Sequence, residues 1–284
     1  MELLHTYPWL WIGLAALLGL QFGSFLNLLI WRLPVMLHHQ WEDDVTHFQG
    51  QEVPNRPAFN LFFPSSHCTS CMAPLRASEL VPVLSYFWLK GRCAHCNAKV
   101  SWRYPLVELA VAAWWVWSAS HWGVSPAALA WSAFGSLLLA LALIDADTML
   151  LPDNLTLPLL WVGLVLSAMG WISVQLADSV WGAVAGYLSL WSVQAVFKMI
   201  TGKQGMGEGD FKLLAALGAW LGWLALPGLV LMASLLGVMA ALLMRWRGDL
   251  ASDQALPFGP YLAVAGVCIA IFEPALMFSH RFVY

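Results

Sequence analysis

Long apolar runs dominate the chain and alternate with polar segments of very unequal length. A helix that crosses a membrane needs about 20 mostly apolar residues. Eight segments approach that length, with Pro227 as the expected break between the sixth and the seventh. These segments are residues 8–31, 104–121, 125–144, 154–172, 176–198, 211–225, 226–244 and 259–278. The pattern predicts an all-α polytopic membrane protein with about eight transmembrane helices.

The composition agrees with this fold class. Hydrophobic residues make up 60% of the 284 positions and charged residues only 10%, whereas soluble domains contain about 25% charged residues. The first apolar segment is too long for a cleaved signal peptide, and no lysine or arginine precedes it, so we expect a retained membrane anchor. The net charge of −3 argues against a nucleic-acid partner, which would require a basic surface.

The positions of lysine and arginine predict the orientation, because these residues concentrate on the cytoplasmic side of membrane proteins. If the N-terminus lies outside, every lysine and arginine except Arg281 lies in or beside a predicted cytoplasmic segment. We therefore expect a first transmembrane helix over 1–31, a cytoplasmic domain over 32–103 and a seven-helix membrane domain over 104–284.

Two C-x2-C pairs in the cytoplasmic segment have the spacing of a zinc ribbon. They are Cys68 and Cys71, then Cys93 and Cys96, with 21 residues between the pairs. Four thiolates complete a tetrahedral zinc site and leave no open position for substrate, so we expect a small zinc-ribbon-like domain with a structural ion. Asn97 follows the second pair, where a positive φ is expected. The alternatives are reduced, unligated cysteines or a redox pair, although the βαβ context of the latter is missing.

Two aspartates are the candidates for the chemistry. Asp145 lies at the inner end of the third predicted span, and Asp210 begins the sixth, at the same membrane face. A carboxylate near hydrocarbon costs about 2.5–3.5 kcal/mol on insertion scales, which favours a functional explanation. Two carboxylates in contact share one proton, as in aspartic proteases.

Structural roles for these acids are also open from the sequence. Asp210 has the position of an N-cap, and Asp145 that of a solvated helix end. Asp147 shares the loop after the third span, Asp153 is expected to cap the fourth, and Glu108 inside the second span either pairs with a neighbouring helix or binds a ligand.

Six motifs spread over nearly the whole chain carry a resemblance to a known family. They are FGSFLNLLIWRLP (22–34), the two cysteine pairs, SWRYPLVELA (101–110), IDADTMLLPDNLTLPL (144–159), GKQGMGEGDFKLLAALGAWLG (202–222) and PFGPYLAVAG (257–266). The sequence resembles the bacterial type IV prepilin peptidases. In that family one catalytic aspartate lies seven residues before the proline of the third-span motif, here Pro152, and the other ends a Gly-x-Gly-Asp motif. The resemblance therefore implies Asp145 and Asp210 as the catalytic pair.

The resemblance also implies the rest of the function. The substrates would be prepilins and pseudopilins of pilus and type II secretion systems, cut after a glycine on the cytoplasmic face of the bacterial inner membrane. S-adenosylmethionine would donate a methyl group to the new amino terminus. No residue can be assigned to methyl transfer, but residues 32–103 are the only segment polar enough to hold such a cofactor, and 78–89 is expected to form an interfacial helix within it. His38, His39 and His47 are interpreted as solvated surface.

Two other functions share part of this pattern. A presenilin-like intramembrane protease also uses Gly-x-Gly-Asp but lacks the cysteine ribbon. A non-enzymatic transporter with a zinc-stabilised cytosolic domain would be expected to line successive spans with polar residues, whereas most spans here carry only isolated ones.

Overall fold

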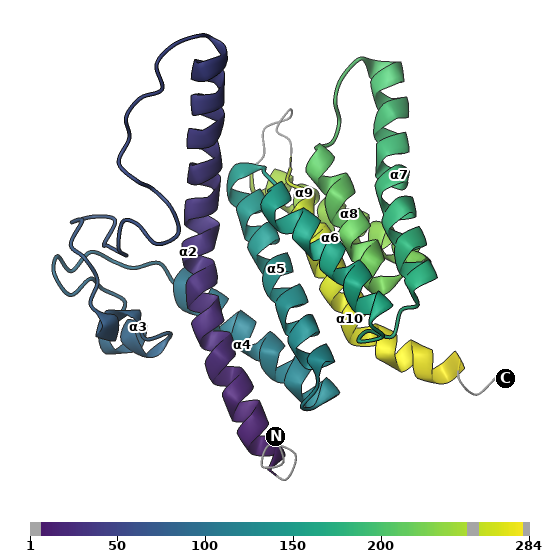
Figure 1. The fold of residues 1–284 in the computed structure, drawn as a ribbon, viewed down its shortest axis with the longest axis horizontal. Helices are drawn as coiled ribbons and strands as arrows, with labels where there is room; N and C mark the ends of the chain where they lie inside the picture. The colour runs from purple at the N-terminus through teal and green to yellow at the C-terminus, as the bar shows by residue number, and fades with distance from the viewer. Residues whose placement is uncertain (1–6, 249–255, 281–284) are drawn as a thin grey trace. The chain divides into compact units, whose positions relative to one another are not determined.

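The computed structural model is all-helical and describes residues 7–248 and 256–280, with side chains in the last helix described as far as Phe272 (Figure 1). The helical elements are α2 (Pro8–Phe48), η1 (Ala77–Leu80), α3 (Leu84–Trp88), α4 (Arg103–Trp122), α5 (Pro126–Thr148), α6 (Asp153–Ala168), α7 (Leu176–Thr201), α8 (Glu208–Leu221), η2 (Trp223–Ala225), α9 (Leu226–Arg247) and α10 (Gly259–His280). They divide into two compact units, which meet in the chain between Ser136 and Leu137, so α5 begins in the first and ends in the second.

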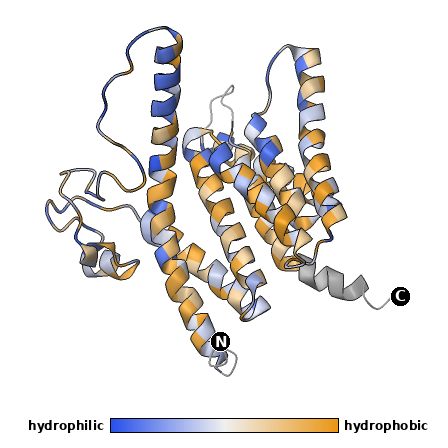
Figure 2. Ribbon diagram, in the orientation of Figure 1, coloured by the Kyte–Doolittle hydropathy of each residue, from blue (hydrophilic) through white to orange (hydrophobic). Residues whose placement is uncertain are grey.

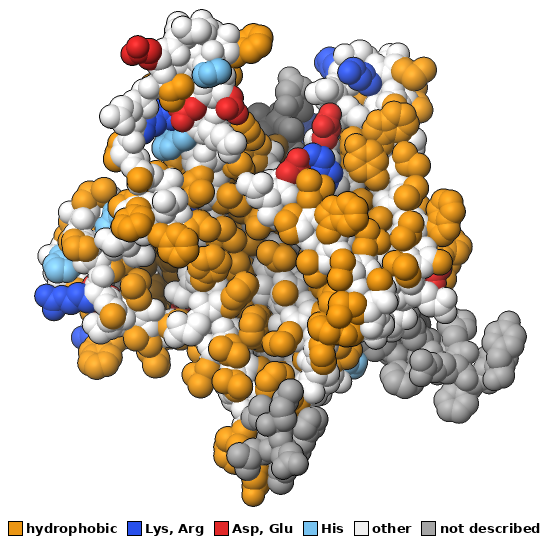
Figure 3. Space-filling view, viewed as in Figure 1, with side chains coloured by type: hydrophobic (Ala, Val, Ile, Leu, Met, Phe, Trp, Pro, Cys, Tyr) orange, Lys and Arg blue, Asp and Glu red, His pale blue; other side chains and the backbone are white. Residues whose placement is uncertain are grey.

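Within the described residues, four helical segments are long and apolar enough to cross a membrane: Pro8–Phe48, Pro126–Thr148, Leu176–Thr201 and Trp223–Arg247. Asp153–Ala168 and Gly259–Phe272 are shorter apolar helices. Hydrophobic side chains cover much of the face drawn in Figure 3. Exposed apolar side chains also occur on α9, where Leu231, Val238 and Leu242 are each more than half exposed. Exposed apolar area of this extent fits contact with lipid. Every predicted span overlaps a helix, although α6 and α8 end before the predicted limits of their spans. The number of eight crossings stays a prediction. Arg281 lies outside the described residues.

The first helix is longer than expected. Hydropathy predicts its end near residue 31, but α2 continues through Pro34 to Phe48, and its residues change from apolar to polar along the axis (Figure 2). Hydropathy marks where a segment leaves the membrane, whereas backbone hydrogen bonds decide where a helix ends.

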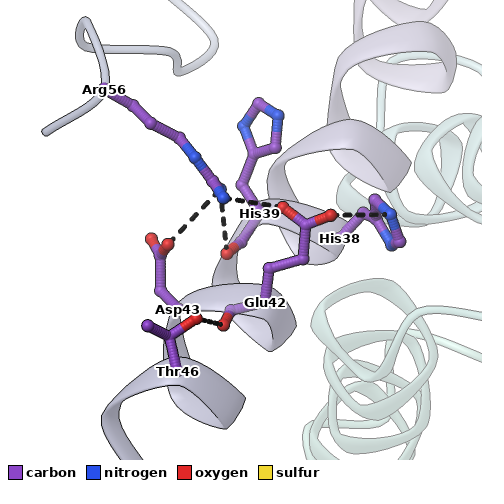
Figure 4. A network of polar contacts seen from close by, with 6 residues as sticks. All are labelled: His38, His39, Glu42, Asp43, Thr46 and Arg56. Atoms are coloured by element: carbon purple, nitrogen blue, oxygen red, sulfur yellow. Dashed lines mark hydrogen bonds and ion pairs between the residues drawn. The ribbon is translucent and has the colours of Figure 1, made fainter. Parts of the chain in front are cut away.

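A polar network holds the following loop against this extension (Figure 4). The Arg56 guanidinium pairs with Glu42 at 2.7 Å and with Asp43 at 3.3 Å. His38 is exposed and lies 3.2 Å from Glu42, and His47 is exposed as predicted. His39 is only half-buried and its ring packs edge-on against a phenylalanine. The three histidines therefore lie at the surface, as the sequence indicates.

Two glycines bring α2 and α4 together in the first unit. A Cβ added at Gly19 would lie 2.7 Å from Cα of Ala112, and one added at Gly23 would lie 2.6 Å from Cα of Glu108. Helices in lipid gain little from the hydrophobic effect, so close backbone packing of this kind is a main source of their association. Glu108 is consequently fixed at a point where the two backbones almost touch.

The second unit is built around α8, which packs against α6, α7 and α10 (Figure 1). Every residue of α8 from Phe211 to Leu221 except Lys212 is buried. Gly182 of α7 contacts Gly218 of α8 backbone to backbone, and Trp220 donates its indole N–H to the Leu159 carbonyl of α6 at 2.8 Å. A helix of 14 residues is about 21 Å long, shorter than a bilayer core, and its neighbours supply the apolar surroundings instead.

Three expected boundaries are wrong. The break after the sixth span falls at Gly222, whose φ is +80°, and Pro227 lies in the first turn of α9. Residues 78–89 do not form one interfacial helix, because Val83 has φ +61° and separates η1 from α3. Asp153 is the first residue of α6 and makes no cap, since Pro152 occupies the N-cap position.

Candidate functional site

Asp145 lies in the last turn of α5 and is only 5% exposed. Its Oδ2 accepts the backbone N–H of Gly259, the first residue of α10, at 2.9 Å. The carboxylate is therefore held against the start of another helix, and the interpretation of Asp145 as a solvated helix end is wrong.

Asp210 is the third residue of α8 and is 7% exposed. Gly207 is the N-cap of this helix, and no cap hydrogen bond from a side chain is formed, so the interpretation of Asp210 as an N-cap is also wrong. Its Oδ1 is buried without a hydrogen-bond partner among the described residues. A buried polar atom without a partner costs free energy, which favours a functional explanation for this side chain.

Leu151 shows that the two aspartates approach each other. A Cβ added at Gly209, next to Asp210, would lie 2.6 Å from Cβ of Leu151, and one added at Gly259 would lie 3.2 Å from its Cδ2. Asp145 and Asp210 are close enough for their charges to influence each other. Two buried carboxylates that interact in this way can hold one proton between them.

The other acids nearby have different surroundings. Asp147 is exposed. It lies two residues after Asp145, and this spacing turns its side chain about 200° around the helix axis, away from the direction of Asp145. Asp153 forms an ion pair with Lys212 at 2.7 Å, which joins the first residue of α6 to the fifth residue of α8. Neither carboxylate is buried as Asp145 and Asp210 are.

The four predicted cysteines form one cluster whose sulfur atoms all lie within 4.8 Å of one another. Both C-x2-C loops have the same backbone conformation and hydrogen bonding. The N–H after each pair, from Met72 and from Asn97, donates to the carbonyl of the first cysteine at 2.9 and 3.0 Å. Both residues have positive φ, +58° and +57°. The positive φ predicted for Asn97 is confirmed, and Met72 is its counterpart in the first loop.

Backbone donors also prepare the sulfur atoms for a cation. The N–H groups of Cys71 and Ser70 lower the pKa of Cys68 to about 6, which favours its thiolate. For Cys96 the N–H of Ala98 also favours the thiolate, but desolvation and the three neighbouring cysteines raise its pKa to about 11. Four sulfurs this close cannot all be thiolates without a cation to neutralise them, and a metal ion is the group that the cluster fits.

A cavity of about 430 Å³ lies beside this cluster, within the first unit. Its wall includes Cys68 and Cys93, residues of α2 such as Asn27 and Arg32, and Glu108 of α4. Pockets that bind small molecules have volumes of about 300–1,000 Å³. The cavity is therefore large enough for a cofactor.

The fold and these sites together define a multi-pass, all-helical membrane protein with a four-cysteine cluster and a buried pair of aspartates. Residues 17–122 match the bacterial peptidase A24 N-terminal domain, and residues 132–242 match the type IV leader peptidase family. The chain is 48% identical over 273 residues to a prepilin leader peptidase/N-methyltransferase of Aeromonas hydrophila, covering 94% of this chain and 92% of that protein. It is 45% identical over 272 residues to one of Pseudomonas aeruginosa, with coverage of 94% and 92%. The chain belongs to the type IV leader peptidase family. No solved structure matches it.

Two residues of the aspartate site are not predicted from the sequence. Gly259 holds Asp145, and Leu151 packs between the glycines beside both acids. The motif at 257–266 contains Gly259, but its sequence does not indicate a hydrogen bond to Asp145, 114 positions away.

Proposed function

We propose that this chain cleaves the leader peptides of prepilins with Asp145 and Asp210 and then methylates the new amino terminus. Its membership in the type IV leader peptidase family and the names of its bifunctional relatives support both activities. The observation that carries the catalytic assignment is the proximity of two buried carboxylates, one of which has an oxygen without a hydrogen-bond partner among the described residues.

The geometry suggests how the pair works. Gly259 fixes one oxygen of Asp145 by its N–H, and Oδ1 of Asp210, which has no hydrogen-bond partner in the described part of the chain, is available to a substrate or a water molecule. One carboxyl group holds the shared proton and donates it to the scissile carbonyl oxygen, while the other carboxylate removes a proton from the attacking water. The carboxyl group that took the proton from water then donates it to the nitrogen of the leaving group, the carbon–nitrogen bond breaks, and one hydroxyl of the tetrahedral intermediate returns its proton to the other carboxylate.

The substrates that we infer are prepilins and pseudopilins, cut at the cytoplasmic face of the bacterial inner membrane. The distribution of lysine and arginine supports an orientation with the N-terminus outside and the basic segments in the cytoplasm. This distribution also agrees with eight membrane crossings. A presenilin-like protease and a transporter are both less well supported, because the family matches cover the cysteine loops as well as the aspartate region.

The test is leader cleavage of a purified prepilin followed by mass spectrometry. Asp145→Asn and Asp210→Asn should each abolish cleavage, because an amide cannot exchange the proton. Asp147→Asn is the matched control and should keep substantial activity, since that side chain is exposed on another side of α5. Cleavage at the wild-type rate by either of the first two variants would refute the assignment.

We further propose that zinc is the metal of the cysteine cluster. Four sulfur ligands and short C-x2-C loops suit tetrahedral zinc, and such an ion stabilises the fold and leaves no position for substrate. The ligands would be Cys68, Cys71, Cys93 and Cys96, whose sulfurs already lie within 4.8 Å of one another.

The methyl donor, S-adenosylmethionine, would bind in the cavity beside this cluster. The cavity is lined only by residues up to Glu108, in the first unit, whereas the two aspartates belong to the second. Separate sites predict separable activities. An Asp145→Ala, Asp210→Ala double variant should therefore still methylate a substrate supplied already cleaved. A folded double variant that transferred no methyl group would support one shared pocket instead.

A further inference from the structure

Glu108 is a buried carboxylate in the cavity wall for which the functions above provide no role. It lies on α4 and is 8% exposed. Its Oε2 accepts the backbone N–H of Val83 at 2.7 Å, and the Ser24 hydroxyl donates a second hydrogen bond. Both donors are neutral, whereas an ionised carboxylate has about four lone-pair sites. Its charge and its remaining acceptor capacity suit a cationic ligand in the cavity.

The surrounding backbone fixes this carboxylate in place. Gly23 of α2 lies so close that an added Cβ would be 2.6 Å from Cα of Glu108. On the other side, Val83 has φ +61°, which is rare for a β-branched residue and costs on the order of 1–3 kcal/mol. Strain of this kind persists where the surroundings enforce it, often at ligand sites. The hydrogen bond to Glu108 is one of the contacts that hold Val83 in this conformation.

Two other charged groups of the cavity are already engaged with the protein. Arg32 donates to the carbonyls of Asn60 and Pro64 at 2.8 and 2.6 Å, and Glu79 accepts the N–H of Arg76 at 2.9 Å. The cavity is also lined by His67, Arg92 and Lys99, beside the cysteine loops. Glu108 is thus the buried acid of this cavity, and the groups with positive charge come from α2 and the loops.

We propose that Glu108 binds the α-ammonium group of the newly cleaved substrate and accepts a proton from it. This proposal rests on the methyltransferase activity. An ammonium nitrogen has no lone pair, so methylation requires that it first lose a proton. Transfer of that proton to the Glu108 carboxylate leaves a neutral amine. The amine lone pair then forms a bond to the methyl carbon of the sulfonium donor as the carbon–sulfur bond breaks, giving a methylammonium terminus and a neutral thioether.

The test measures methyl transfer from S-adenosylmethionine to a synthetic peptide that begins with the mature amino terminus. Glu108→Gln keeps the shape and an oxygen that accepts the Val83 N–H but cannot take a proton. We expect a loss of about 10²- to 10⁴-fold at neutral pH, the range for removal of a general base. The loss should shrink as the pH rises above about 8, where an α-amino group loses its proton unaided. Glu108→Asp, which retains a carboxylate, should keep part of the rate.

Thermal unfolding of the same preparations reports folding of the first unit, leader cleavage reports the second, and Glu52→Gln is the matched control, an exposed glutamate of the first unit. A wild-type methylation rate in Glu108→Gln would overturn the proposal. So would a loss that stays constant at high pH, because it would indicate a structural role. Weakened binding of S-adenosylmethionine with unchanged peptide binding would overturn it as well, by assigning Glu108 to the amino group of the donor. A wild-type protein that cleaves but never methylates would remove the methyltransferase proposal itself.

Discussion

Substitution of Gly259 by alanine is a sharp test of how the structure holds Asp145. The added Cβ would lie 2.7 Å from Oδ2 and 3.1 Å from Cγ of Asp145. Ordinary van der Waals contact begins near 3.4 Å, so the two groups must separate by about 0.7 Å. The carboxylate is buried against protein, which leaves a shift of the side chain or of the start of α10 as the available responses.

The expected effect is on catalysis more than on insertion into the membrane. A displacement of about 1 Å in a catalytic group costs on the order of 10²-fold in rate, and we expect leader cleavage to fall by about ten- to a hundred-fold. The measurement is kcat/KM for a purified prepilin in detergent. Methylation of an already cleaved peptide should remain, because the cavity beside the cysteines belongs to the other unit.

Gly228→Ala is the matched control, because Gly228 is also in the first turn of a helix and its added Cβ would meet only the end of the Ile269 side chain at 3.7 Å. Cleavage by Gly259→Ala at the wild-type rate would show that the contact between Gly259 and Asp145 does not set the working geometry. Equal loss of both activities, together with a lowered unfolding temperature, would indicate general overpacking and would also refute the argument.

Three further predictions concern the same two regions. Gly209→Ala should impair cleavage, since its added Cβ would lie 2.6 Å from Cβ of Leu151. Gly207→Ala should be tolerated, because its added Cβ would lie 3.7 Å from Oδ2 of Asp210. Cleavage assays on both variants check this. Gly23→Ala should destabilise the first unit by about 1–3 kcal/mol, the usual cost of overpacking, and should lower methylation. In Gly13→Ala the added Cβ meets no atom within 4 Å, so thermal unfolding and methylation assays should give wild-type values. Cys93→Ser removes a buried ligand and should reduce zinc, measured by elemental analysis, from about one ion per chain, with methylation lost before cleavage; a zinc-free wild-type protein that is stable and active would contradict this.

The sequence predicts most of the helices and the cysteine cluster for physical reasons that are local. In lipid, the backbone N–H and C=O groups of an apolar run of about 20 residues find their hydrogen-bond partners by forming a helix. A C-x2-C loop brings two sulfurs together wherever it occurs. The helix ends are less predictable. The polar part of α2 after Pro34 continues as a helix although its hydropathy no longer indicates a membrane, and the turn at Gly222 depends on a positive φ that any glycine could adopt.

The environment of the acids is not predictable in this way, because contacts between distant segments create it. Asp145 meets Gly259 across 114 positions, and Glu108 meets Val83 across 25. From the sequence alone, Asp210 is compatible with an N-cap as well as with a catalytic acid, and only the resemblance to a family distinguishes these roles. In the structure its place at the third position of α8, with one oxygen buried and without a partner among the described residues, distinguishes them.

Glycine contacts recur at both sites, and this has a consequence for how the acids are held. Gly23 lies against Glu108, Gly259 against Asp145, and Gly209 against Leu151, which also lies beside Gly259. In lipid, helices cannot rely on the hydrophobic effect to bring them together, so close backbone packing sets their spacing. The same close packing brings a backbone N–H within reach of Asp145. A carboxylate that must be buried in an apolar protein therefore obtains its fixed position from glycines on the neighbouring helix, and replacing such a glycine should disturb the chemistry at a site whose own residues are unchanged.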